Sequence, residues 1–77
     1  MIYDLKPTDG RKSFYGKAVV IVDGNTETLY SYNTPIIKAV ITDGKREYIK
    51  LWDGWTATTG RHIKAFCGMN KKQFMEL

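Results

Sequence analysis

Few side chains in this 77-residue chain could carry out covalent catalysis, because it holds one histidine and one cysteine. His62 and Cys67 are five positions apart, so on a helix their side chains point about 140° apart, which disfavours a Cys–His nucleophilic pair. A structural zinc site needs about four such ligands, and an internal disulfide needs a second cysteine. We therefore expect no catalysis, no cofactor and no metal, with Cys67 packed as a small apolar residue and His62 on a helix surface near Phe66.

Paired carboxylates for acid–base chemistry are also not evident. Asp23, Asp43 and Asp53 each precede a glycine, and Asp-Gly is typical of tight turns because both residues tolerate a positive φ angle. The sequence contains neither a phosphate-binding loop nor a Gly-x-Gly-x-x-Gly pattern. These observations favour a binding protein over an enzyme.

Two short segments have residue types suited to binding. Thr58 and Thr59, with Arg61 beside them, stand at the expected start of a helix, where backbone N–H groups attract phosphate or carboxylate. The alternative is that the threonines only cap the helix. Trp52 and Trp55 flank a turn, where they either anchor an interface or seal the edge of the core.

The net charge of +4 is unevenly distributed. Residues 1–35 carry four basic and four acidic side chains, whereas residues 36–77 carry eight basic and four acidic ones, so the excess lies in the second half. A basic half favours an anionic partner such as nucleic acid. The alternative is an ordinary solvated surface.

The elements that must position these residues are predicted from periodicity and turn residues. The expected strands are residues 14–22, 26–32, 36–42 and 47–52, and the expected helix is residues 59–67. Asp-Gly turns join the strands into two hairpins, Asn33-Thr34-Pro35 separates the hairpins, and Gly68 ends the helix. Residues 1–12 are expected to form an irregular arm, and residues 71–77 a weak helix or strand. We predict an α+β fold, with a four-stranded antiparallel sheet and one short helix on one face, in a single domain over residues 13–77.

Strand alternation sorts the side chains onto two sheet faces. The face expected against the helix carries Val20, Leu29, Ile37, Ile41, Ile49 and Leu51. The opposite, aromatic–basic face carries Tyr15, Lys17, Tyr30, Tyr32, Lys38, Tyr48, Lys50 and Trp52. Aromatic rings on a sheet can stack unpaired bases while lysines meet phosphates. A protein partner, including a second copy, or a covered core would also explain such a face.

The sequence further predicts a cytoplasmic protein that does not enter a membrane. The N-terminus lacks a long apolar segment of the kind found in signal peptides, and the longest apolar run, residues 18–22, is too short to span a bilayer. A lone thiol fits a reducing compartment.

Three stretches resemble a family of small uncharacterised proteins of phages, prophages and other mobile elements. They are Ser-Phe-Tyr-Gly-Lys-Ala at residues 13–18, Leu-Tyr-Ser-Tyr-Asn-Thr at 29–34, and Trp-Asp-Gly-Trp-Thr-Ala-Thr-Thr-Gly-Arg-His-Ile-Lys-Ala-Phe at 52–66. The resemblance covers about residues 13–67, and Phe74 departs from it, because a tryptophan is expected there. It implies a small accessory protein that binds host or rival nucleic-acid machinery.

Three functions follow as expectations. In the first, the aromatic–basic face contacts nucleic acid or a nucleic-acid-processing complex of the host. In the second, the protein is a stoichiometric inhibitor of a host or anti-phage defence protein, for example one of CRISPR type. In the third, it is a structural protein that forms homodimers or larger oligomers.

Overall fold

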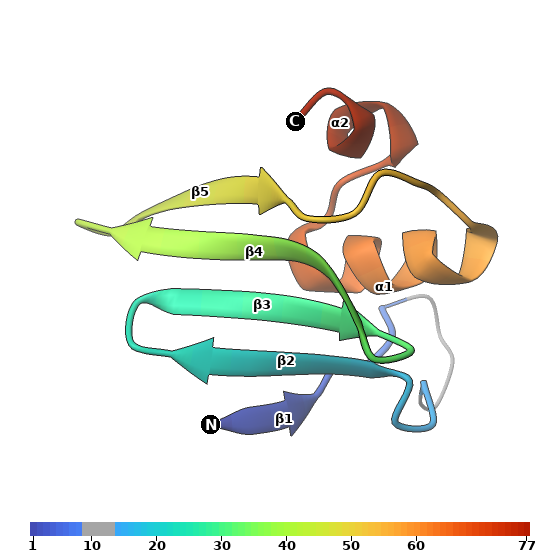
Figure 1. Cartoon of the computed structure of the whole chain (residues 1–77), viewed down its shortest axis with the longest axis horizontal. Coiled ribbons are helices and arrows are strands. Elements are labelled where there is room, and N and C mark those ends of the chain that lie inside the picture. The colour runs from blue at the N-terminus through green and yellow to red at the C-terminus, as the bar shows by residue number, and fades with distance from the viewer. Residues whose placement is uncertain (9–13) are drawn as a thin grey trace.

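Five antiparallel strands and two short helices make up the computed structural model, which describes residues 1–8 and 14–77 (Figure 1). The elements are β1 (Ile2–Asp4), β2 (Ala18–Asp23), β3 (Thr26–Ser31), β4 (Thr34–Thr42), β5 (Lys45–Lys50), α1 (Ala57–Cys67) and α2 (Lys71–Met75). The strands lie in sequence order, β1-β2-β3-β4-β5, each antiparallel to its neighbours. The predicted α+β class is confirmed, whereas the prediction of four strands and one helix is wrong.

The additional strand comes from the segment expected to be an irregular arm. Within β1, Ile2 pairs with Ile21 and Tyr3 with Val20, and Val22 N–H donates to the Met1 carbonyl at 2.7 Å. Three residues are too few for alternation to reveal a strand, but they supply partners to the backbone groups at the edge of β2. The Asp9-Gly10 pair and the rest of the arm from residue 9 lie outside the described residues.

Two-residue turns join each pair of consecutive strands from β2 through β5. The predicted hairpins at Gly24-Asn25 and Asp43-Gly44 are confirmed, with Asp23 paired to Thr26 and Thr42 to Lys45. The expected break at Asn33-Thr34-Pro35 is instead another hairpin turn, at Tyr32-Asn33. Both of these residues have positive φ, 51° and 68°, the backbone form that suits the twist of a hairpin.

The core lies between the sheet and the helices. Its buried members include Val20, Leu29 and Ile37, as predicted, together with Ile63 of α1 and Phe74 of α2. A β-bulge places Leu29 opposite Ile37 and Tyr30 opposite Pro35, so the intervening Ile36 is also buried, at 2% exposed. α1 lies at the end of the sheet where β3 ends, and α2 lies beside β5 (Figure 1).

Side chains and a glycine cap the ends of the two helices. The Thr56 hydroxyl accepts from the Thr59 N–H at 3.0 Å, so α1 begins two residues before the predicted start. Gly68, at φ 76°, caps its C-terminus as predicted. The expected weak element at the tail is α2, which the Asn70 and Gln73 side chains stabilise through a capping box.

The predicted orientation of the last strand is wrong. The turn at Asp43-Gly44 pairs Tyr48 with Ala39 and Lys50 with Ile37, which places Tyr48 and Lys50 on the helix side of the sheet. Ile49 and Leu51, expected in the core, are 43% and 42% exposed. Ile41 is half-buried.

We call the sheet surface turned away from the helices the open face. Its side chains include Ile2, Val19, Ile21, Thr28, Tyr30, Lys38, Val40 and Ile49, as the strand pairings show. In the described ranges, no helix is both long enough and apolar enough to cross a membrane.

Candidate functional site

The structure divides the predicted aromatic–basic face among three places. Tyr48 and Lys50 lie on the helix side, where the Tyr48 ring contacts Phe66 at 6.5 Å and Lys50 Nζ pairs with Asp53 at 3.1 Å. Tyr30 and Lys38 lie on the open face. The remaining members lie at the end of the sheet beside the start of α1: Tyr15, Lys17, Tyr32 and Trp52.

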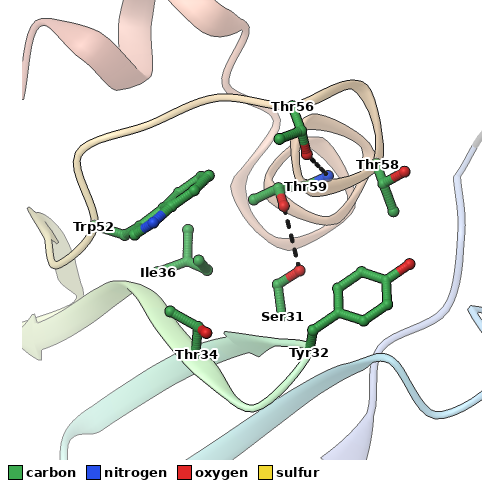
Figure 2. A pocket seen from close by; sticks show the side chains of 8 residues that line it. All are labelled: Ser31, Tyr32, Thr34, Ile36, Trp52, Thr56, Thr58 and Thr59. Carbon is green, nitrogen blue, oxygen red and sulfur yellow. Dashed lines mark hydrogen bonds between the residues drawn. The ribbon is translucent and has the colours of Figure 1, made fainter.

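Two adjoining hollows of the described surface gather these four residues with the predicted anion-binding residues. The larger, of about 460 Å³, is lined by Ser31, Tyr32, Thr34, Ile36, Trp52, Thr56, Thr58 and Thr59 (Figure 2). The smaller, of about 190 Å³, is lined by Phe14, Tyr15, Lys17, Tyr32, Thr58, Arg61 and His62. They share Tyr32 and Thr58, and we call them together the turn-end site.

Backbone turns, and not strand alternation, aim the two tyrosines of this site. Tyr15 and Gly16 have φ angles of 54° and 75°, and Lys17 N–H donates to the Phe14 carbonyl at 3.0 Å, closing a tight turn. Tyr32 has φ 51°. Such angles are rare for bulky residues and cost about 1 kcal/mol or more each. Both rings are exposed, at 82% for Tyr15 and 53% for Tyr32.

The smaller hollow is bordered by cations and aromatic rings. Lys17 Nζ lies 5.3 Å from the centre of the Tyr32 ring, within the range of a cation–π contact. Arg61 is exposed on the first turns of α1. The charged residues in the described lining of this hollow are Lys17 and Arg61, and two cations side by side favour an anionic ligand.

A buried polar cluster supports the floor of the site. His62 is 1% exposed, and its Nδ1 lies 2.8 Å from the Ser31 hydroxyl, which in turn lies 3.4 Å from the Thr59 hydroxyl. Burial, and secondarily the Arg61 guanidinium, lower the pKa of His62. Its placement on a helix surface near Phe66 was a wrong prediction, because the ring packs edge-on against Phe14 at 4.5 Å.

Each tryptophan of the flanking turn lies against a glycine. A Cβ on Gly54 would come within 2.7 Å of the Trp52 ring, and one on Gly60 within 2.5 Å of the Trp55 ring. Trp55 also contacts Phe74 at 5.9 Å and so seals the core, while Trp52 borders the larger hollow.

Sequence reasoning placed Gly54 in a turn and Gly60 at the helix start, but it did not predict that a tryptophan ring lies against each of them. It also did not predict the pairing of Ser31 with His62. A glycine inside an expected helix is the signal that could have indicated close packing at Gly60. Ser31 sits in a strand with no feature that marks it, and only the tertiary fold brings it to α1.

The remaining reactive group is packed inside the fold. Cys67 packs against the core as predicted, its Sγ lies 3.3 Å from the Ile63 carbonyl oxygen, and burial raises the pKa of its thiol. Within the described ranges, no group of three or more His, Cys, Asp or Glu side chains is placed to hold a metal ion.

Comparison with known proteins places the chain in a family. Searches of the curated proteins and of the solved structures each found no match. A model of a family of unknown function, DUF8033, matches residues 3–76. That description assigns no activity, so the expectation of an uncharacterised family is confirmed, while the link to phages and mobile elements stays a prediction. Because the match spans nearly the whole sequence, the chain belongs to the DUF8033 family.

Proposed function

We propose that this protein is a small non-enzymatic nucleic-acid-binding protein, and that its turn-end site contacts the ligand. The observation that carries the proposal is the grouping of the exposed Tyr32 ring with Lys17 and Arg61 around one hollow. Proteins that bind nucleic acid commonly combine cations, which meet phosphates, with aromatic rings, on which bases stack.

The proposed surface differs from the whole sheet face expected from the sequence. Tyr48 lies outside this surface, and its hydroxyl accepts a hydrogen bond from Arg46 Nε at 3.0 Å. Lys50 is held between Asp53 and α2, with its Nζ 3.4 Å from the Met75 carbonyl oxygen. Thr58, Thr59 and Arg61, expected as a separate anion site, instead join the same surface.

The biological setting belongs to the same proposal. The segment at residues 52–66 supports an accessory protein of a phage or other mobile element, which acts in the host cytoplasm on nucleic acid or on a nucleic-acid-processing complex. The partner then supplies the chemistry, and this chain supplies binding.

Fluorescence anisotropy with labelled oligonucleotides at low salt tests the proposal. We expect binding that weakens steeply with salt. Lys17→Gln should weaken binding and reduce the salt slope by about 1. Lys38→Gln is the matched control, because it removes the same charge from the open face. Absence of binding at low salt, or equal effects of the two substitutions, would contradict the proposal.

A second candidate function is favoured by the open face, on which Ile2 and Ile49 are both more than 40% exposed. Exposed apolar side chains on one surface are typical of a protein interface, as an inhibitor of a host or defence protein requires. Affinity capture with and without nuclease separates the candidates. A nuclease-resistant complex that is lost on Ile49→Lys and kept on Lys17→Gln supports the inhibitor, and the opposite pattern supports nucleic-acid binding.

A further inference from the structure

We infer that the larger hollow of the turn-end site holds one unpaired nucleobase, so that the ligand is a single strand and not a duplex. This inference rests on the proposed function and specifies which form of nucleic acid the site takes. It is carried by the size, the lining and the position of the hollow relative to the cations.

The size and lining suit a flat ring with polar edges. The volume of about 460 Å³ lies within the range of small-ligand pockets, about 300–1,000 Å³. Trp52 and the buried Ile36 form one side of the hollow, and Tyr32 and Thr58 form the other (Figure 2). Aromatic and aliphatic surface on one side with hydroxyl groups near the rim is what a base needs, because its faces are apolar and its edges form hydrogen bonds.

The hydroxyls differ in their availability. The Thr56 oxygen accepts from the Thr59 N–H, and the Thr59 hydroxyl lies beside Ser31 in the buried cluster. Within the described residues, the hydroxyls of Thr34 and Thr58 make no hydrogen bond to another residue, so they remain available to the edge of a base.

Lys17 and Arg61 lie where the bound nucleic-acid strand would continue beyond the base. Lys17 and Arg61 line the smaller hollow, which meets the larger one at Tyr32 and Thr58. A base in the larger hollow therefore places the adjoining phosphates near these cations. In a duplex the base faces are covered by stacking, so Trp52 can reach one only when the base is unpaired.

Three labelled ligands of equal length test the inference by anisotropy: a thymine single strand, the same strand with abasic sites in place of bases, and a duplex. We expect the abasic strand and the duplex to bind about 5- to 150-fold more weakly than the thymine strand, the range for one base stacked on an aromatic ring. An RNA strand of uracil distinguishes the source of the base, because either nucleic acid satisfies the same chemistry.

The variants assign the effect to the hollow. Trp52→Leu should bind the thymine and abasic strands equally, and Thr34→Val, which keeps the shape of the side chain, should weaken only the thymine strand. Tyr48→Leu is the matched control, an aromatic side chain lost from outside the site. Circular dichroism verifies folding, and the comparison of ligands on the unmodified protein needs no variant.

The failures of the two ideas are distinguishable. If none of the ligands binds at low salt, the proposed function is overturned, and this inference falls with it. If nucleic acid binds but the abasic strand or the duplex binds as tightly as the thymine strand, the proposed function stands and the base-binding hollow is overturned.

Discussion

At the scale of single residues, the Trp55 ring requires glycine at position 60. A glycine inside a helix costs about 1 kcal/mol relative to alanine, yet here an added Cβ would lie 2.5 Å from the Trp55 ring. We predict that Gly60→Ala lowers the free energy of unfolding by about 1–3 kcal/mol in spite of the better helix propensity, because the ring must shift within a packed core. Chemical denaturation measures the loss.

The source of that loss can be isolated in a second background. With Trp55→Leu the ring is absent, so adding Gly60→Ala should be neutral or stabilising by up to about 1 kcal/mol. A loss of the same size in both backgrounds would show that something other than Trp55 excludes a side chain at Gly60.

We predict that His62 makes the stability of the protein depend on pH. Its pKa is lowered in the folded protein, so between the folded value and the ordinary value of about 6.5 the unfolded chain binds more protons. The stabilisation that comes from keeping His62 neutral is complete above pH 6.5 and is lost as the pH falls below it. The free energy of unfolding then decreases by at most about 1.4 kcal/mol per pH unit. Unfolding free energies measured between pH 7.5 and 5 should therefore decrease.

The matched variant is His62→Asn, which keeps a polar group beside Ser31 and cannot titrate in this range. The free energy of unfolding of this variant should be lower at pH 7.5 and should change less between pH 7.5 and 5. If the two proteins have parallel profiles, His62 is not the group responsible.

At the scale of elements, β5 shows both the strength and the limit of alternation. Its period-two pattern was recognised, but the choice of face was wrong. A two-residue turn at Asp43-Gly44 forces Thr42 to pair with Lys45, and counting outward from this pair brings Lys50 opposite Ile37. The length of the turn therefore sets the register, and the register sets the face on which each side chain of β5 lies.

The turns that place Tyr15 and Tyr32 are harder to predict from the sequence. Positive φ is expected for glycine and asparagine, and tyrosine carries no such signal. Alternation assigned both rings to a sheet face, whereas the turns aim them past the end of the sheet. The C-cap Gly68, by contrast, is chemically distinctive and was predicted correctly, whereas the N-cap is Thr56, two residues nearer the N-terminus than the predicted start implies.

The short helix α2 depends on one buried side chain. Five residues do not form a stable helix alone, and Phe74 is fully buried between Trp55 and the core. We predict that Phe74→Ala costs about 3–5 kcal/mol, a large part of the stability of a small domain. Met75→Ala, on the exposed side of the same helix, should cost less than about 1 kcal/mol. Denaturant titration compares the two, and similar losses would contradict the assigned role.

At the scale of the whole molecule, the open face is the surface through which we expect any homodimer to form. If the protein is a monomer, Ile49→Thr with Leu51→Thr should change the free energy of unfolding by no more than about 1 kcal/mol, because both side chains are already more than 40% exposed. Thermal melts at several protein concentrations test this. A Tm that rises with concentration and falls by far more in the double variant would instead support the homodimer.

The candidate site is also a property of the whole molecule. Seven of its lining residues belong to the predicted sets: Tyr15, Lys17, Tyr32, Trp52, Thr58, Thr59 and Arg61. The other six were not among the predicted site residues: Phe14, Ser31, Thr34, Ile36, Thr56 and His62. The meeting of these residues at one end of the sheet was not predicted, since it depends on the turn at Tyr32-Asn33 and on where α1 docks against Ser31. Local patterns specify elements, whereas such a site is assembled by contacts between residues far apart in sequence.

The order of the strands has a consequence for how the chain acquires its shape. Every strand pairs with its neighbour along the chain, and two-residue turns join the consecutive strands from β2 through β5. The entropy lost in closing these loops is therefore small. Folding rates rise as contacts become more local. We therefore expect this sheet to form hairpin by hairpin, faster than its strand content alone would suggest.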